Sequence, residues 1–297
     1  NTSGPSMLDT DAPTGEGSWG TVVGPGKAID TDRYFVVCPN MLGSSYGSTN
    51  AASIDPTTGR PYGPRFPEIT VGDIVATQRK LLDHLEIPQL VAIAGPSYGG
   101  IQGFQWAVDR PDDMKGLVAV VTSPFVPRFM AKANLTRLQE ALLKDSNWNG
   151  GDYYDRGGVE ETLIGMRIQT LKTYGVDRRL RDTILDDEDV EQAIRASATL
   201  WAKEFDANSL IILAKALVGF NTVPRFRRIK AKTLYVLSST DRVFRPVLAF
   251  PVMAALKLSG VDASFFKIVS DYGHMASGED GADKWAPRLQ EFLRNLD

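Results

Sequence analysis

VAIAGPSYGG, residues 91–100, is the stretch that decides the predicted fold. An apolar run reaches Gly95 and ends in a G-x-S-x-G motif, and an amphipathic stretch follows over residues 101–108. Strand, tight turn and helix in this order form the context of a nucleophile elbow, where a serine hydroxyl is exposed on a sharp corner above a helix N-terminus. Gly95 and Gly99 suit this turn because strand and helix approach too closely there for Cβ atoms. The alternative is an ordinary turn in which Ser97 only caps the helix.

Strands and helices alternate on both sides of this motif. Apolar runs predict strands at residues 34–38, 90–94, 116–121, 233–237 and 264–269. Amphipathic patterns predict helices at 70–85, 101–108, 247–258 and 282–296, the first of them capped by Thr70. This alternation is typical of an α/β fold with a mainly parallel sheet and helices on both faces.

The alternation lapses between residues 125 and 228, where the pattern is mostly helical. Helices are expected at 131–144, 160–174, 190–204 and 209–217. A helical block inserted after one strand of such a sheet usually forms a lid. We therefore expect a first part of the core at 1–124, a helical lid at 125–228 and a second part of the core at 229–297. The acidic run at 186–189 is expected to be a solvated loop before a helix.

Composition and charge limit which binding partners and which cellular compartment we expect for this protein. Of the 297 residues, 43% are hydrophobic and 23% are charged, as in ordinary globular proteins. The net charge of −3 implies no basic face, so we expect no nucleic-acid partner. No apolar run approaches the ~18 residues of a membrane-spanning helix and no signal peptide is visible, so we expect a cytoplasmic protein with no membrane partner. Cys38, the only cysteine, lies in the apolar run 34–38 and is expected to be a small core residue.

Three polar residues follow three of the predicted strands. A serine hydroxyl is a weak nucleophile and needs a base, which in turn needs a partner that fixes its tautomer. Of the two histidines, His274 comes just after the last strand, and Asp241 comes just after the strand before it. The carboxyl ends of parallel strands meet at one edge of a sheet, and the order Ser97, Asp241, His274 is that of an α/β-hydrolase. The sequence therefore predicts a catalytic triad.

Each of these residues also has a plainer interpretation. Asp241 could be a turn or capping residue, and His274 a hydrogen-bonded loop histidine. Asp271, three residues before His274, is a rival acid, although it is too close along the chain to be preferred. His84 lies inside a predicted helix, where it is expected to pack or to face solvent. Two distant histidines make no metal site without carboxylates, so we expect neither a metal nor a cofactor.

Several longer motifs carry a resemblance to a known family. They are GPGKAIDTDRYFVV at residues 24–37, NMLG at 40–43, YGST at 46–49, GRPYG at 59–63 and NWNGGDYY at 147–154. On these motifs the chain resembles the homoserine O-acetyltransferase family of α/β-hydrolases over almost its whole length. Relatives in that family include deacetylcephalosporin C acetyltransferase and esterases of similar sequence.

This resemblance implies acyl transfer by a ping-pong mechanism on small-molecule esters or acyl-CoA. Ser97 would attack an acyl donor, such as acetyl-CoA as co-substrate, with His274 as the base and Asp241 as the partner that orients it. Arg167 would pair with a substrate carboxylate, for which the fork of a guanidinium is suited. The alternative for Arg167 is a surface charge on a helix. Family members are commonly dimers, so a homodimer formed through the lid is expected.

The resemblance also implies further strands before residue 1. In the family they lead into the oxyanion loop, which corresponds here to the first residues of the chain. A backbone N–H of Thr2 or Ser3 would therefore join that of Tyr98 in holding the oxyanion. A sheet without those strands would expose an open edge. We expect the first strands of the fold to be absent from this chain and to exist elsewhere, as a separate N-terminal chain or in a longer sequence.

Two departures from the family bear on the acyl acceptor. Met275 stands where homoserine enzymes have an aspartate that helps to hold the substrate amino group, and a thioether cannot pair with an ammonium. Gly-Pro-Ser-Tyr at 95–98 replaces the usual Gly-Gly-Ser-Met. These departures favour hydrolysis of short-chain, acetyl-type esters. The close alternative is CoA-dependent O-acetylation of homoserine or another hydroxyl. An inactive hydrolase fold that serves as a binding module is a third possibility, against which the complete triad argues.

Overall fold

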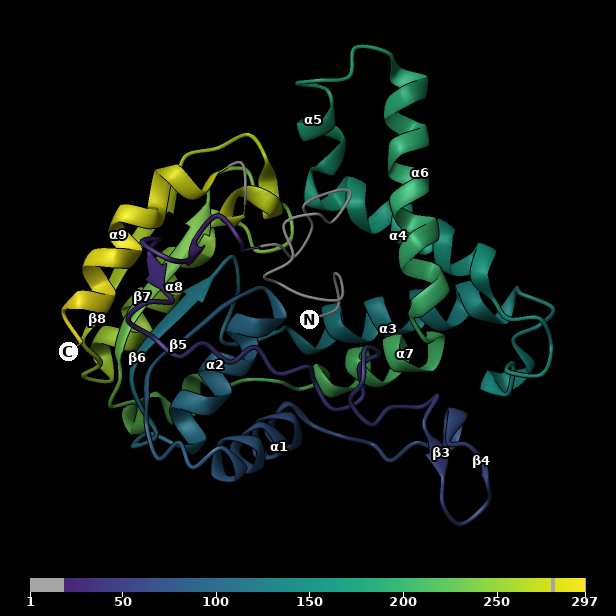
Figure 1. Cartoon of the computed structure of the whole chain (residues 1–297), viewed down its shortest axis with the longest axis horizontal. Helices are drawn as coiled ribbons and strands as arrows, with labels where there is room; N and C mark the ends of the chain where they lie inside the picture. The colour runs from purple at the N-terminus through teal and green to yellow at the C-terminus, as the bar shows by residue number, and fades with distance from the viewer. Residues whose placement is uncertain (1–18, 279–280, 297) are drawn as a thin grey trace.

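The computed structural model describes residues 19–278 and 281–296 (Figure 1). Its strands are β1 (Val23–Gly24), β2 (Ile29–Asp30), β3 (Ile54–Asp55), β4 (Arg60–Pro61), β5 (Leu90–Pro96), β6 (Met114–Val120), β7 (Lys232–Ser238) and β8 (Ala263–Ile268). Its α-helices are α1 (Val71–His84), α2 (Tyr98–Asp109), α3 (Arg128–Leu143), α4 (Glu160–Tyr174), α5 (Val176–Leu180), α6 (Asp187–Glu204), α7 (Ala207–Ala216), α8 (Ala249–Leu258) and α9 (Ala282–Arg294). Short 3₁₀ helices are η1 (Gly63–Arg65), η2 (Asn149–Gly151), η3 (Val223–Arg228), η4 (Pro246–Leu248) and η5 (Gly273–Ser277).

The centre of the molecule is a parallel sheet with the strand order β5-β6-β7-β8. Its register pairs Pro96 with Val120 and Val120 with Val236, so the carboxyl ends of these strands lie level with one another. Ser97 directly follows β5, while Asp241 and His274 lie in the segments after β7 and β8. The topology therefore brings the three predicted triad residues to one edge of the sheet.

Side chains of the central strands alternate between two apolar layers, as the period of two in a strand requires. On β6 and β7, Val118 and Leu234 pack in the layer that contains Trp285 and Leu289 of α9. Their neighbours along the strands pack instead with Phe104 of α2 and with residues of α1 and α8. Helices thus cover both faces of the sheet, with α9 on one face and α1, α2 and α8 on the other (Figure 1). The prediction of a parallel sheet between helices is confirmed.

Helices α3 to α7 follow β6 along the chain and stand to one side of the sheet (Figure 1). A separate apolar cluster holds them together, and it includes Leu142 of α3, Ile164 of α4, Ile194 of α6 and Leu213 of α7. Asp186 caps α6 by accepting the backbone N–H groups of residues 188 and 189, so the acidic run forms the first turn of α6. The run is exposed to solvent, as expected, but it is helical and not a loop, because negative charge at a helix N-terminus is favourable.

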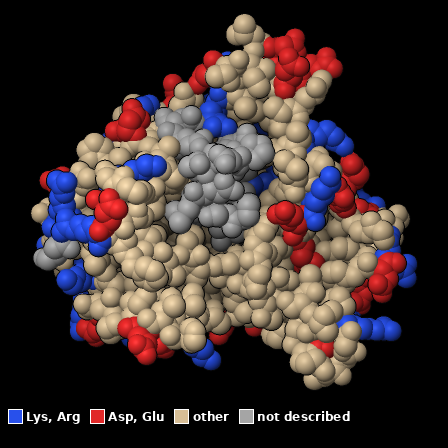
Figure 2. Space-filling view, in the orientation of Figure 1, with Lys and Arg blue, Asp and Glu red and all other residues tan. Residues whose placement is uncertain are grey.

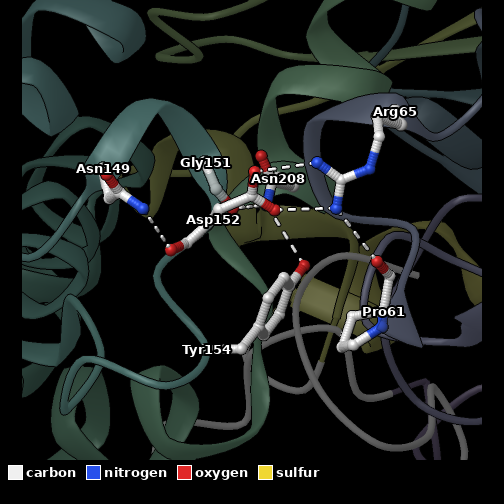
Figure 3. Close-up of polar contacts among 7 residues, drawn as sticks. All are labelled: Pro61, Arg65, Asn149, Gly151, Asp152, Tyr154 and Asn208. Carbon is white, nitrogen blue, oxygen red and sulfur yellow. Dashed lines mark hydrogen bonds and ion pairs between the residues drawn. The ribbon is translucent and has the colours of Figure 1, made fainter. Parts of the chain in front are cut away.

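The segment around β3 and β4 is joined by polar contacts to the predicted lid, the block that contains helices α3 to α7 (Figure 3). Arg65 Nη1 and Nη2 each lie 2.8 Å from one carboxylate oxygen of Asp152, and this hydrogen-bonded pair lowers the pKa of Asp152. Asn208 Nδ2 of α7 donates to Gly151 O at 2.9 Å and to the hydroxyl of Tyr154 at 3.1 Å, which holds the loop that carries Asp152 against α7. Because Arg65 and Asp152 are exposed, their ion pair contributes specificity of docking more than stability.

Residues 34–38 are not a strand in the structure, contrary to the sequence-based prediction. Cys38, expected in the core, is exposed, and so is 79% of the Phe35 side chain. A strand needs a hydrogen-bonded neighbour, and a cavity separates this segment from β5, the edge strand of the described sheet. The apolar composition of residues 34–38 was correctly recognised, but it cannot form a ladder by itself.

The turn from β5 into α2 leaves almost no room for a side chain at Gly95. A Cβ added there would lie 2.8 Å from the backbone C of Gly99. At Gly99 itself the nearest atom to such a Cβ would be Pro96 Cδ, at an ordinary 3.7 Å. The expected close packing is therefore confirmed for Gly95 and wrong for Gly99. The role of Gly99 in this contact is that its backbone packs directly against Gly95.

We expect Gly95→Ala to lower the free energy of unfolding by about 1–3 kcal/mol, the usual cost of overpacking. Gly99→Ala, in the first turn of a helix, should leave that free energy unchanged or raise it slightly. Urea denaturation followed by tryptophan fluorescence measures both values. Equal destabilisation by the two substitutions would contradict the packing described for this turn.

Candidate active site

Ser97 sits on the corner between β5 and α2 with a backbone conformation that few non-glycine residues adopt. Its φ is 52° and its ψ is −119°. Three hydrogen bonds hold this corner: Ser97 N donates to Val120 O at 2.9 Å, while Ser97 O accepts from Thr122 Oγ1 at 2.7 Å and from Ile101 N at 3.1 Å. Such a conformation costs about 1–3 kcal/mol and persists only where the surroundings enforce it. The elbow predicted from the sequence is therefore present, and the serine does not cap α2 through its side chain.

His274 and Asp241 form a buried pair. Nδ1 of His274 lies 2.8 Å from Oδ2 of Asp241, and the two residues are only 5% and 3% exposed. Oδ1 of Asp241 accepts the backbone N–H groups of Val243 at 2.7 Å and Phe244 at 3.1 Å, which fixes the carboxylate. An ionised carboxylate can only accept, so Nδ1 carries the proton and Nε2 is the basic nitrogen.

Hydroxyl groups tie the loop that carries Asp241 to the loop that carries His274. Ser239 Oγ and Thr240 Oγ1 both donate to Ser270 O, at 3.0 and 2.7 Å. Thr240 Oγ1 also accepts from Gly273 N at 3.1 Å, directly before the histidine. Sequence reasoning missed these positioning residues, and only their place directly after a strand could have drawn attention to them.

The lid also contacts the imidazole. The ring of Tyr174, the last residue of α4, lies 4.6 Å from the His274 ring between centroids, at an interplanar angle of 47°. On another side, the Phe244 ring lies 5.9 Å from the imidazole. Sequence reasoning missed Tyr174 as well, because a tyrosine near a helix end gives no sign of which loop it will meet.

Ser97 and His274 line the same cavity, whose volume is about 510 Å³. Tyr98, Tyr174 and Met275 are also among the residues that line it. Met275 packs against the apolar cluster of the lid, and its side chain brings no charge to the position next to the histidine. The cavity therefore offers a nucleophile and a base to one molecule in apolar surroundings.

Tyr98 is the first residue of α2, so its backbone N–H lies at the N-terminus of a helix directly after Ser97. This is the place from which an oxyanion donor is expected to act. Its hydroxyl donates to Leu213 O on α7 at 3.2 Å, and burial raises the pKa of Tyr98, which keeps the phenol protonated. Thr2 and Ser3, the other predicted oxyanion residues, lie outside the described residues.

Arg167 is buried in the lid, with only 4% of its surface exposed. Its guanidinium carbon lies 4.7 Å from the centroid of the Trp201 ring, a cation–π contact between α4 and α6. The alternative of a surface charge is therefore wrong. Arg167 is not among the described residues that line the cavity. Its contact with a substrate carboxylate therefore stays a prediction.

The remaining candidates lie apart from the pair. His84 is the last residue of α1 and faces solvent, and Asp271 is exposed as well. Asp241, not Asp271, is the acid that contacts His274. The structure therefore joins Asp241 to His274 and places Ser97 and His274 in the lining of one cavity, whereas His84 and Asp271 do not line it.

Two features of the described residues bear on other classes of function. Within residues 19–278 and 281–296, no group of three or more His, Cys, Asp or Glu residues is placed to hold a metal ion. No described helix combines the length and apolarity needed to cross a membrane. On the face shown in Figure 2, acidic and basic side chains are interspersed around the rim.

Comparisons with known proteins identify the fold and the family of the chain. The model of the alpha/beta hydrolase fold matches residues 15–280. Homoserine O-acetyltransferase from Haemophilus influenzae is 38% identical over 296 residues, which cover 94% of this chain and 82% of that protein. Among solved structures, esterase E22 has a TM-score of 0.82 at 27% identity, covering 92% of this chain and 81% of its own. Homoserine O-acetyltransferase from Bacillus anthracis has a TM-score of 0.81 at 26% identity, covering 92% and 80%. The chain is therefore an enzyme of the α/β-hydrolase fold and belongs to the homoserine O-acetyltransferase family.

Proposed function

We propose that Ser97, His274 and Asp241 catalyse acyl transfer through an acyl-enzyme, and that water is the main acceptor. The enzyme would then hydrolyse short-chain esters of the acetyl type. One observation carries this proposal: the buried imidazole, oriented by Asp241 at 2.8 Å, lines the same cavity as the strained Ser97. A serine with a positioned base and a fixed acid is the arrangement that acyl transfer requires.

The steps follow from the protonation states of the three groups. Nε2 of His274 takes the proton of Ser97 Oγ–H as Oγ forms a bond to the ester carbonyl carbon. The tetrahedral intermediate then collapses, the bond to the leaving group breaks, and the imidazolium returns the proton to the leaving oxygen. Water attacks the acyl-enzyme in the same way, and the released acid restores Ser97. Asp241 stays ionised and stabilises the imidazolium throughout.

The negative oxygen of the intermediate needs donors that are already in place. The backbone N–H of Tyr98 supplies one, and its position at the N-terminus of α2 adds the favourable end of the helix dipole. A second N–H would come from Thr2 or Ser3, as the family resemblance implies. Loss of a single such donor costs about 3–4 kcal/mol of transition-state stabilisation in a typical serine hydrolase.

Met275 supports water as the acceptor. It lines the cavity directly after the proposed base and presents a thioether among apolar lid residues. An ammonium group placed there would lose its hydration without gaining a partner of opposite charge. Water needs no such partner, and esterase E22 shares this fold at 27% identity.

The second candidate is CoA-dependent O-acetylation of homoserine or another hydroxyl, with acetyl-CoA as the donor. The observation in its favour is the 38% identity to homoserine O-acetyltransferase from Haemophilus influenzae. In this case Arg167 would hold a substrate carboxylate, after leaving its present contact with Trp201. The acyl-enzyme is common to both candidates, which differ only in the acceptor.

Asp241→Asn should lower kcat for p-nitrophenyl acetate by roughly 1,000- to 10,000-fold, because the amide favours the wrong tautomer of His274. Asp271→Asn is the matched control, since Asp271 lies in the same loop as the histidine but is exposed. Its kcat should stay within a few-fold of the wild type. Full activity in Asp241→Asn would contradict the assigned acid, and an inactive wild type would favour a binding module.

The acceptor is tested by product analysis with p-nitrophenyl acetate or acetyl-CoA in the presence of homoserine. We expect free acetate to exceed O-acetylhomoserine in the wild type, because nothing at Met275 holds the amino group. Met275→Asp should move the products toward O-acetylhomoserine, whereas the apolar control Met275→Leu should not. O-acetylhomoserine as the main wild-type product would make the second candidate correct.

A further inference from the structure

The loop that leads to His274, residues 270–274, meets the predicted lid as well as the sheet. Helix α4 ends at Tyr174, and Gly175 leads from it into α5. We call residues 174–182, from the end of α4 through α5, the α4–α5 corner. Three residues of this corner contact three consecutive residues of the histidine loop, the proposed base included. The corner therefore lies directly against the segment that carries the base.

Two glycines bring the backbones of these two segments together. Gly175 and Gly273 both have positive φ, at 93° and 56°. A Cβ added at Gly273 would lie 2.9 Å from Tyr174 O, and one added at Gly175 would lie 3.1 Å from Tyr272 O. The contact is thus reciprocal, since each glycine faces the carbonyl group that precedes the other. Glycine permits both the positive φ and the close approach of one backbone to another.

Capping of α4 explains only part of this arrangement. Gly175 ends the helix in the left-handed conformation, and its N–H donates to Leu171 O and Lys172 O, as is common for a helix C-cap. Gly219 has nearly the same φ, 89°, yet a Cβ added there would meet nothing within 4 Å. A left-handed turn therefore does not by itself need contact with another segment. The approach to Gly273 is a second constraint, which the cap does not require.

The backbone contact also sets the distance between two rings. Tyr174 precedes Gly175, and its ring centroid lies 4.6 Å from that of His274, which follows Gly273. Asp241 holds Nδ1 of the imidazole, but one hydrogen bond leaves a ring free to turn about the axis of that bond. A neighbouring ring at this distance limits such a rotation, because protein interiors leave little space between packed side chains.

A polar contact joins the same two segments on the other side of the glycines. Tyr272 precedes Gly273, and its hydroxyl donates to Asp182 Oδ2 at 2.5 Å. Asp182 lies between α5 and α6, and a hydrogen bond to a carboxylate is stronger than one between neutral groups. The corner therefore contacts residues 272, 273 and 274 by a hydrogen bond, a backbone contact and a ring contact.

We propose that the α4–α5 corner positions the base of the proposed reaction. Tyr174, Gly175 and Asp182 act through the histidine loop and keep the imidazole in the orientation in which Nε2 can take the proton of the serine. They are positioning residues, because each acts on the loop and none supplies or accepts the transferred proton. The inference rests on the proposed function, since it concerns the base of that reaction.

Gly175→Ala separates this role from the need for a left-handed turn. We expect kcat for p-nitrophenyl acetate to fall by about 10- to 100-fold with KM little changed, because a misplacement of about 1 Å can cost that much in rate. Gly219→Ala is the matched control, since it adds the same Cβ at nearly the same φ in open space. Its kcat and KM should match those of the wild type.

Side-chain variants test the corner without a change at the glycines, and they decide the question if circular dichroism shows that Gly175→Ala is not folded. Tyr174→Leu should lower kcat, and Tyr174→Phe, which keeps the ring, should recover most of the loss. Asp182→Ala and Tyr272→Phe each remove the same hydrogen bond. Each should lower kcat, and the double variant should lower it no further than the more affected single variant.

Nuclear magnetic resonance follows the imidazole without any turnover. The chain has two histidines, and His84 is exposed, so its ring protons exchange with water. A hydrogen-bonded imidazole N–H signal from isotope-labelled histidine therefore belongs to Nδ1 of His274. This signal should shift or broaden in Gly175→Ala and Tyr174→Leu and stay in place in Gly219→Ala. A purely structural role of the corner would lower stability and leave the signal of the folded protein unchanged.

Three results would overturn the proposal. They are an equal loss of kcat in Gly175→Ala and Gly219→Ala, a rise in KM with no fall in kcat, and an imidazole signal that is unchanged in both Gly175→Ala and Tyr174→Leu. An inactive wild type would instead refute the proposed function. A shifted imidazole signal in Gly175→Ala would then still support the positioning of His274 by the corner, so the two failures are distinguishable.

Discussion

The backbone of Ser97 is held in a conformation with positive φ that a serine rarely adopts. The arrangement of the site depends on the packing and hydrogen bonds that impose this conformation. The turn closes because Gly95 has no Cβ to strike the backbone of Gly99. Val120 O, at the end of β6, accepts from Ser97 N, and Thr122 Oγ1, two residues further on, donates to Ser97 O. A strain of about 1–3 kcal/mol is thus offset by the folding of the sheet, and Ser97 lines the cavity from this enforced turn.

The base depends on two separate parts of the molecule. From the sheet side, Asp241 and the hydroxyls of Ser239 and Thr240 fix the loop of His274 relative to β7. From the lid side, the ring of Tyr174 covers the imidazole. Tyr98 completes the connection, since its phenol bonds to α7 while its backbone follows the nucleophile. The position of the base therefore depends on contacts from the sheet and from the predicted lid.

Patterns in short stretches of the sequence predicted the features that are determined by residues close together in the chain. The strand, turn and helix around Ser97 came from composition and spacing, and the order of Asp241 and His274 after their strands located the pair. The prediction was wrong for residues 34–38, because a strand requires a partner that no local pattern records. The hydroxyl bonds between the two loops and the contact of the Tyr174 ring with His274 were missed for the same reason, as they join segments distant in sequence.

The central claim is that Ser97 takes up an acyl group as a covalent intermediate, and intact-mass spectrometry tests it most directly. The chain is mixed with p-nitrophenyl acetate and quenched with acid within the first turnovers. The account predicts one acetyl group per chain, located on Ser97 by peptide mapping and absent from Ser97→Ala. Turnover of the ester with no adduct on the wild type, or with the acetyl group on another residue, would contradict it.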